Sequence, residues 1–237
     1  MMRIAALLAA LAAAFAACAQ SDYPSRPIRL ITPFNPGGAI DVYSRLIAEP
    51  LGKRLGQNVV VEAIAGANTI VGTRALVRAA PDGHTFMITT MSTAANNKIP
   101  FSKTLPYDPE RDLAPITQLS YGTVRLVAAG AVKPIAMTGP QRSASIPDLA
   151  TFSEQGIPNV DLAIWVGAYA PAGTPRPILE RLRRELRAVI HAPEVREKMI
   201  AQGQTPIGNT PEEFVAIVRA DFPKWEALIR ASGAKIE

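Results

Sequence analysis

The chain has 237 residues, of which 48% are hydrophobic and 19% charged, so its composition is that of a globular protein. Its 21 prolines and 16 glycines follow no period, which excludes collagen-like and low-complexity sequences. A net charge of +5 is too small and too dispersed to indicate a nucleic-acid partner. One cysteine and two histidines exclude a disulfide framework and a zinc site of the usual ligand number, and we expect no cofactor.

Residues 1–19 have the pattern of an export signal. Arg3 precedes an unbroken apolar run that is too short to span a bilayer, and the small residues Ala17 and Ala19 form a cleavage site. We therefore predict cleavage after Ala19 and a periplasmic mature protein. A lipobox-like pattern around Cys18 leaves open a second route, in which Cys18 becomes a lipid anchor. A buried N-terminal helix is a weaker alternative, because the run has no polar face.

The sequence after the signal alternates between strand and helix patterns. This order predicts an open, largely parallel α/β sheet, in which ligands bind outside the carboxyl ends of the strands. We expect a strand at 27–34, a turn at 35–38, a helix at 40–55, a strand at 58–62, a helix at 69–80, a strand at 85–90 and a polar loop at 91–97.

The C-terminal third reads mainly as helix. Thr174 is the expected N-cap of a first helix with Pro175 as its first residue, a short helix follows at 194–202, and the last helix begins at Asn209 and ends at Gly233. Their apolar stripes indicate core positions. Two prolines fall in the interior of predicted helices, and we expect Pro50 to kink or shorten its helix and Pro223 to bend its own.

Two loops carry the chemistry. In the first, at 33–41, Gly37 and Gly38 stand between a strand and a helix N-terminus, where backbone N–H groups and the helix dipole favour a carboxylate or phosphate. Paired glycines also occur in ordinary tight turns, and Asp41 has a purely structural reading as a helix cap. The second loop, at 91–97, supplies hydroxyls and amides after a strand, or is simply a polar loop.

Several ordered motifs carry a family resemblance. They are Tyr23-Pro24-Ser25-Arg26-Pro27-Ile28, the Pro-Phe-x-Pro-Gly-Gly-x-x-Asp loop at 33–41, Ala79-Ala80-Pro81-Asp82-Gly83, Leu105-Pro106-Tyr107-Asp108-Pro109-x-Arg111-Asp112 and Ala170-Pro171-Ala172-Gly173-Thr174-Pro175. On these motifs the chain resembles the substrate-binding receptors of tripartite tricarboxylate transporters, the Bug proteins. The resemblance implies a receptor, not an enzyme, that captures a small carboxylate in the periplasm for membrane permease subunits.

The resemblance also implies a fold and a site. The fold is α/β and periplasmic-binding-protein-like, of the type II Venus-flytrap kind. The expected ligand-binding residues are Phe34, Gly37, Gly38, Ala39, Asp41, Ser92, Thr93 and Asn97. The expected parts are a signal peptide at 1–19, the N-terminal part of the first lobe at 20–122, hinge strands with a stub of the second lobe at 123–138, and a mostly helical return to the first lobe at 139–237.

The chain departs from the family pattern in two places. Asn68 and Thr69 replace two glycines in the loop after the second strand. At 128–131, two stretches meet that a long segment separates in the family, so we infer an internal deletion that leaves one lobe nearly complete and the second truncated. With one wall, the cleft should bind weakly. Uncovered apolar residues should favour self-association; these are Val124, Leu126, Val127, Val132 and Ile135.

Two other functions stay open. The chain is a non-functional deletion product in one, and an enzyme that uses the Gly37-Gly38 loop in the other. No nucleophile elbow, phosphate-binding loop or zinc-protease motif is present in the sequence. His84 and His191 have no motif partner, so structural roles are the simpler interpretation of both.

Overall fold

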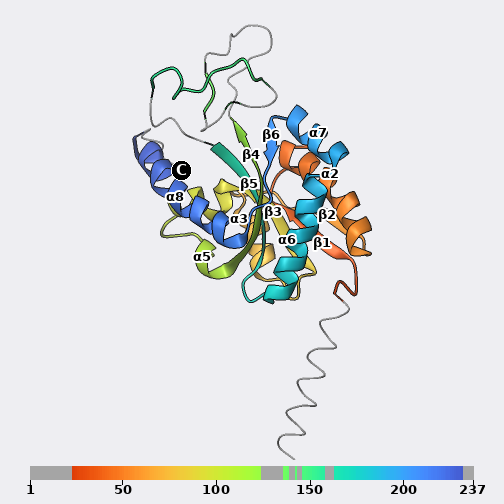
Figure 1. Cartoon of the computed structure of the whole chain (residues 1–237). Helices are drawn as coiled ribbons and strands as arrows, with labels where there is room; N and C mark the ends of the chain where they lie inside the picture. Colours follow the sequence, from red (N-terminus) through yellow and green to blue (C-terminus); the bar gives the residue numbers. More distant parts are fainter. Residues whose placement is uncertain (1–22, 124–135, 139–141, 143–145, 158–162, 232–237) are drawn as a thin grey trace, which may run out of the picture.

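The computed structural model describes residues 23–123, 136–138, 142, 146–157 and 163–231 (Figure 1). A six-stranded sheet with the order β2-β1-β3-β5-β4-β6 forms its centre. The strands are β1 (Ile28–Thr32), β2 (Val59–Ala63), β3 (Thr85–Thr90), β4 (Leu113–Thr123), β5 (Ala163–Pro171) and β6 (Gln204–Pro206).

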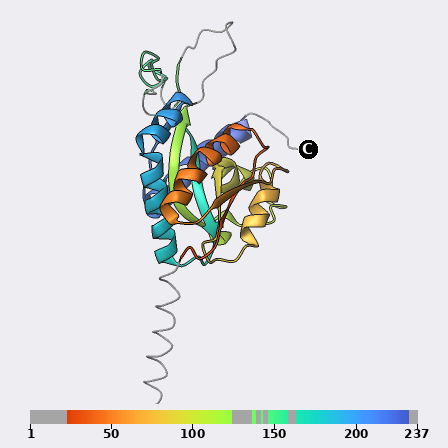
Figure 2. The same ribbon diagram turned by 90° about the vertical axis from the view of Figure 1, so that its right-hand side faces the viewer.

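Helices lie on both faces of this sheet (Figures 1 and 2). One core cluster packs α2, α6 and α7 against the sheet, and the other packs α3, α4 and α8 against the opposite face. The helices are α2 (Ala39–Leu55), α3 (Ile70–Val77), α4 (Met91–Ala94), the 3-10 helix η1 (Asn96–Lys98), α5 (Pro109–Asp112), α6 (Arg176–Ile190), α7 (Pro193–Ala201) and α8 (Pro211–Ala231).

The central strands are apolar on both sides because both faces are covered. Leu30 and Phe86 belong to the first cluster while their neighbours Ile31 and Met87 belong to the second, and all four are 0% exposed. Burying such a side chain contributes about 1.5–3 kcal/mol each. This explains why the sequence shows near-continuous apolar runs and not strict alternation at these strands.

The predicted alternation is confirmed in the first half of the sheet, but the sheet is parallel only there. β1 pairs in parallel with β2 and β3, whereas β3–β5, β5–β4 and β4–β6 are antiparallel. β5 was not predicted from the sequence. Gly167 interrupts its apolar pattern, and the structure gives the reason: a Cβ at this position would lie 2.2 Å from Cζ of Phe214.

Pro50 does not shorten α2, which continues past it, and α8 likewise continues past Pro223; a proline removes one N–H, and packing of the remaining turns holds the helix. The kink at Pro50 and the bend at Pro223 stay predictions. Two other local predictions are wrong. The N-cap of α6 is Pro175, not Thr174, whose hydroxyl donates to the Pro171 carbonyl at 2.7 Å. The segment 91–97 is largely helical, because α4 and η1 occupy it.

Some predictions concern residues outside the described ranges. These are the signal peptide, the lipid anchor at Cys18, the apolar residues from Val124 to Ile135, most of the predicted hinge at 123–138, and the helix end at Gly233. Residues 124–162 connect β4 to β5, and the predicted hinge at 123–138 begins at the last residue of β4.

The loops after β1, β2 and β3 and the connection between β4 and β5 lie at the same edge of the sheet. The carboxyl ends of β1, β2 and β3 meet there because these strands are parallel. β5 begins at the same edge, where Val166 lies beside Thr90, and β4 ends there, where Thr123 lies beside Ala163. The connection to the truncated lobe therefore leaves the sheet beside the loops that follow the parallel strands, at the upper edge in Figure 1.

Candidate functional site

Three segments form the candidate site: 33–38 after β1, 64–69 after β2 and 91–98 after β3. Because β1 lies between β2 and β3 in the sheet, the first segment is central and the other two flank it. This is the edge at which open α/β sheets bind ligands.

Gly37 and Gly38 are favoured in the first segment for different reasons. Gly37 adopts the left-handed conformation with φ +76°, which favours glycine, and no atom lies within 4 Å of the position of its absent Cβ. Gly38 is extended at φ −69°; its constraint is close approach, because a Cβ would lie 3.0 Å from the Asn35 carbonyl oxygen. The turn is closed by the Gly38 N–H, which donates to that same oxygen at 3.1 Å.

Backbone donors are available just after this turn. The first intrahelical bond of α2 runs from the Val42 N–H to the Gly38 carbonyl at 2.9 Å. The N–H groups of Ala39, Ile40 and Asp41 therefore precede the helical ladder, and Gly38 offers no side chain to cap them. With the helix dipole, they form an environment that favours an anion.

Asp41 braces the loop. Its carboxylate, 3% exposed, accepts the Gly37 N–H at 2.9 Å and two N–H groups of Arg45 at 3.0 and 3.1 Å. The Arg45 guanidinium, followed by the Gly37 N–H, lowers the pKa of this carboxyl below its ordinary value. The arrangement agrees with the structural alternative that the sequence left open for Asp41. Because Arg45 compensates the carboxylate, Asp41 does not bring an unpaired negative charge to the helix N-terminus.

Thr93 and Asn97 are 0% exposed, and their side chains form hydrogen bonds inside the protein. The Thr93 hydroxyl lies 2.7 Å from that of Thr89 and donates to Thr69 Oγ1 at 3.0 Å. The Asn97 amide donates to the Asn68 carbonyl at 2.8 Å, while its Oδ1 accepts the Asn68 amide at 2.6 Å. These bonds join the segment after β3 to the segment after β2.

The segment after β2 is held in an unusual conformation. Ala67, Asn68 and Thr69 have φ values of +43°, +49° and +74°, which cost about 1–2 kcal/mol per non-glycine residue. The Asn68 and Thr69 side chains make the bonds to Asn97 and Thr93, so the two residues that stand where the resemblance implies glycines supply the cross-links that hold the strained backbone.

Tyr107 completes this polar cluster. Its hydroxyl donates to the Thr93 carbonyl at 3.0 Å and accepts the Asn97 amide at 3.3 Å. Burial raises the pKa of Tyr107 above its ordinary value, so it stays a neutral donor. The cluster is therefore uncharged, and it fixes the two flanking segments relative to each other.

The structure divides the predicted site residues into two groups. Phe34, Gly38 and Ser92 are half-buried and Gly37 and Ala39 are exposed, so these reach the surface of the loops. Asp41, Thr93 and Asn97 are buried and bonded internally. The sequence analysis missed the supporting roles of Arg45 and Tyr107. The signal for Asn68 and Thr69 was present, since both stand where glycine was expected.

The two histidines bond to backbone groups. Nε2 of His84 accepts the Ser25 N–H at 3.2 Å, and Nε2 of His191 lies 3.0 Å from the Ile207 carbonyl oxygen. The described residues contain no group of three or more His, Cys, Asp or Glu side chains that suits a metal ion. Among the same residues, no helix has the length and apolar character needed to cross a membrane.

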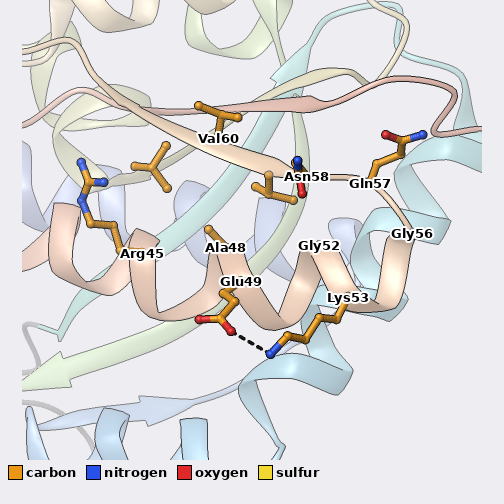
Figure 3. A pocket seen from close by; sticks show the side chains of 11 residues that line it. Arg45, Ala48, Glu49, Gly52, Lys53, Gly56, Gln57, Asn58 and Val60 are labelled. Carbon is orange, nitrogen blue, oxygen red and sulfur yellow. Dashed lines mark hydrogen bonds and ion pairs between the residues drawn. The ribbon is translucent and has the colours of Figure 1, made fainter.

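A hollow of about 930 Å³ lies elsewhere, between α2 and β2 (Figure 3). Its charged residues are already paired, as Lys53 donates to Glu49 at 2.7 Å. It extends to Gly56 and Gln57 at the carboxyl end of α2, the end opposite to the Gly37-Gly38 turn. We therefore do not assign the ligand site to this hollow.

Comparison with known proteins agrees with the resemblance. The chain matches the model of the "Tripartite tricarboxylate transporter family receptor" at residues 43–131 and 121–234. BugT of Bordetella pertussis is 24% identical over 299 aligned positions, covering 91% of this chain and 92% of BugT. That alignment has more positions than the chain has residues, so BugT contains residues that are deleted here.

Solved structures share the fold. A periplasmic transporter superposes with a TM-score of 0.79 at 26% identity, covering 91% of this chain and all of that one. MatC of Rhodopseudomonas palustris, solved with malate, has a TM-score of 0.76 at 21% identity and covers 87% of this chain. Another R. palustris protein, solved with adipate, has a TM-score of 0.78 at 22% identity and covers 91%. The chain belongs to the family of tripartite tricarboxylate transporter receptors, with an internal deletion that leaves its second lobe truncated.

Proposed function

We propose that this protein is a periplasmic solute-binding receptor that holds a small carboxylate at the Gly37-Gly38 turn. The observation that carries the proposal is membership of the receptor family over both halves of the chain. Structural neighbours solved with malate and adipate support a dicarboxylate as the ligand class.

The geometry supports a specific contact. The N–H groups of Ala39 and Ile40 are the donors we assign to the carboxylate, with Phe34 and Ser92 beside them and Gly37 and Gly38 allowing close approach. Asp41, Thr93 and Asn97 support the loops from beneath. The receptor needs no cofactor for this task and carries out no reaction.

The truncated lobe sets the expected affinity. A ligand enclosed by two lobes loses water, which strengthens each polar contact, whereas here the carboxylate stays largely hydrated. Each hydrogen bond then contributes about 0.5–1.5 kcal/mol. A few such bonds must offset an association cost of roughly 4 kcal/mol or more. We therefore expect millimolar affinity or weaker, and self-association through the uncovered edge.

Amide chemical-shift titration tests the site. Malate and adipate are added to the isotope-labelled mature chain up to tens of millimolar, with the corresponding uncharged diamide as a chemical control. We expect saturable shifts at Ala39, Ile40 and Asp41 with the diacids and none with the diamide. A chain that shows no saturable shift is a non-functional deletion product, and the proposal fails. Consumption of the ligand during the titration would establish an enzyme instead.

Two glycine variants separate binding from strain. Gly37 and Gly56 have φ values of +76° and +74°, and neither has an atom within 4 Å of its Cβ position. Valine at either position therefore carries a similar backbone cost, but only Gly37 lies in the site. We expect Gly37→Val to abolish the shifts and Gly56→Val to retain them. Equal effects of the two variants would contradict the proposed site.

Three remaining parts of the proposal have separate tests. Intact-mass measurement on a periplasmic extract should give an N-terminus at Gln20; an uncleaved Met1 contradicts export, and a lipid-modified Cys18 selects the anchored route. Analytical ultracentrifugation should detect dimers, and a strictly monomeric chain contradicts self-association. Co-purification with the permease subunits tests transport, and a chain that does not associate with them is no transport receptor.

A further inference from the structure

A second hollow, of about 230 Å³, lies under α8. Its apolar wall is formed by Ala94, Leu113, Tyr169, Val218 and Phe222. The α4–η1 segment contributes to both the hollow and the candidate site, because Thr93 and Asn97 bond towards the segment after β2 while Ala94 and Lys98 line this hollow. None of the eight residues predicted to bind the ligand of the first site lines the hollow.

The apolar stripe of α8 is wider than its packed core. Phe214 is 0% exposed and contacts the rings of Trp165 and Tyr169 at centroid distances of 5.1 and 5.3 Å. Val218 and Phe222, one and two turns further along, are only half-buried and face the hollow. Part of the apolar surface of α8 is therefore left uncovered by the described residues.

One residue that lines the hollow, Tyr169, has an unpartnered hydroxyl. Tyr169 is 3% exposed, and its hydroxyl is buried without a hydrogen-bond partner among the described residues. Burial raises the pKa of Tyr169 well above its ordinary value, so the group remains a neutral donor. Buried polar groups in folded proteins almost always have a partner, so this hydroxyl calls for one.

The rim carries an uncompensated charge. Arg219 is exposed, and it also lines a shallower hollow of about 540 Å³ that continues past Pro115 and Val215. The described part of the chain places no carboxylate in an ion pair with Arg219. By contrast, Lys98, which also lines the hollow, is neutralised by Glu110 at 2.6 Å. Among the residues that the structure describes, the lining thus combines apolar side chains with the unpartnered hydroxyl of Tyr169 and the unpaired guanidinium of Arg219.

We propose that this hollow is a second binding site, for a single-ring carboxylic acid that carries a further polar group. The ring packs against Leu113 and Phe222, the carboxylate pairs with Arg219, and the second polar group accepts the Tyr169 hydroxyl. The size is suitable, since a cavity of about 150 Å³ already holds benzene. The ligand is recognised here by side chains, not by the backbone amides of the first site.

Amide titration of the mature chain with 4-hydroxybenzoate tests the proposal. We expect saturable shifts at Ala94, Lys98, Tyr169 and Val218. Arg219→Gln should weaken binding about fivefold to tenfold, because it removes a charge-assisted bond. Arg196→Gln is the matched control, since Arg196 is an exposed arginine on α7. The affinity of this variant for 4-hydroxybenzoate should equal that of the wild type. Tyr169→Phe should weaken the binding of 4-hydroxybenzoate more than the binding of benzoate.

Each contrary outcome overturns the proposal. Absence of saturable shifts at millimolar 4-hydroxybenzoate means that water alone fills the hollow. Equal affinity of Arg219→Gln and wild type removes the assigned carboxylate contact, and this variant changes only an exposed side chain, so misfolding does not obscure the result. Loss of the shifts in Gly37→Val would place the probe in the first site instead. Failure of the first site leaves this test intact, because Arg219→Gln and Tyr169→Phe change no residue assigned to that site.

Discussion

Replacing Asn97 by alanine tests whether this residue supports the site or contacts the ligand. Asn97 is 0% exposed, and the side chain joins two segments through a reciprocal pair of bonds with Asn68 at 2.6 and 2.8 Å. Two longer bonds at 3.3 Å reach Thr69 and Tyr107. Alanine removes all four.

The expected cost follows from what remains bonded. Thr69 still accepts the Thr93 hydroxyl, and Tyr107 still donates to the Thr93 carbonyl, so neither loses its last partner. The two short bonds contribute about 1 kcal/mol each, and the vacated space adds roughly another 1 kcal/mol. Asn97→Ala should therefore lower the free energy of unfolding by about 2–3 kcal/mol.

Urea denaturation gives this value, and a double-mutant cycle isolates the pair. Asn68→Gly removes the partner amide at a position with φ +49°, and any relief of strain cancels in the cycle. We expect a coupling of about 1 kcal/mol between the two substitutions. Asn96→Ala is the control in the same short helix: its Oδ1 is buried without a partner among the described residues, so the change should be within about 0.5 kcal/mol.

Two results would refute this reasoning. If Asn97→Ala and Asn96→Ala destabilise the protein equally, the reciprocal bonds do not hold the segments together. If Asn97→Ala keeps wild-type stability but the folded protein loses its response to malate and adipate, Asn97 is a ligand contact, as the family resemblance implies, and not a support.

Three further substitutions have defined outcomes. Asp41→Asn should lower the free energy of unfolding at neutral pH. Because the folded-state pKa of Asp41 is lowered, its stabilising contribution is complete above the unfolded-state pKa of about 4 and is lost as the pH falls through the folded-state pKa. The free energies of unfolding of the two proteins, measured in urea, should therefore converge at low pH, and a difference that stays constant with pH would contradict this. Ala67→Gly, at φ +43°, should stabilise the protein by about 0.5 kcal/mol, and a loss of stability would disprove the strain. Gly167→Ala should lower the free energy of unfolding by about 2 kcal/mol or more, because the added methyl group lies 2.2 Å from the ring of Phe214. Adding Phe214→Leu to this variant should restore part of the lost stability. A Gly167→Ala protein as stable as the wild type would show that the Phe214 ring moves freely.

Local pattern determined the first half of the fold. β3 begins and ends where the apolar run predicts, at Thr85 and Thr90, and α2 ends at Gly56 in the left-handed conformation that its glycine favours. These features depend on residues close together in the chain, whose periodicity and turn chemistry are visible in the sequence. The motifs at 33–41 and their neighbours were also sufficient to identify the family.

Only the tertiary structure decided the remainder, because it depends on contacts between distant residues. β5 forms because β3 and β4 pair with it from either side, and Gly167 makes room for Phe214, which is far along the chain. The family resemblance implies that Asn97 contacts the ligand; the structure buries it and bonds it to Asn68 of another loop, which the sequence did not predict. Composition reveals which side chains can form hydrogen bonds, whereas burial and the position of a partner determine whether those bonds are used within the protein or remain for a ligand.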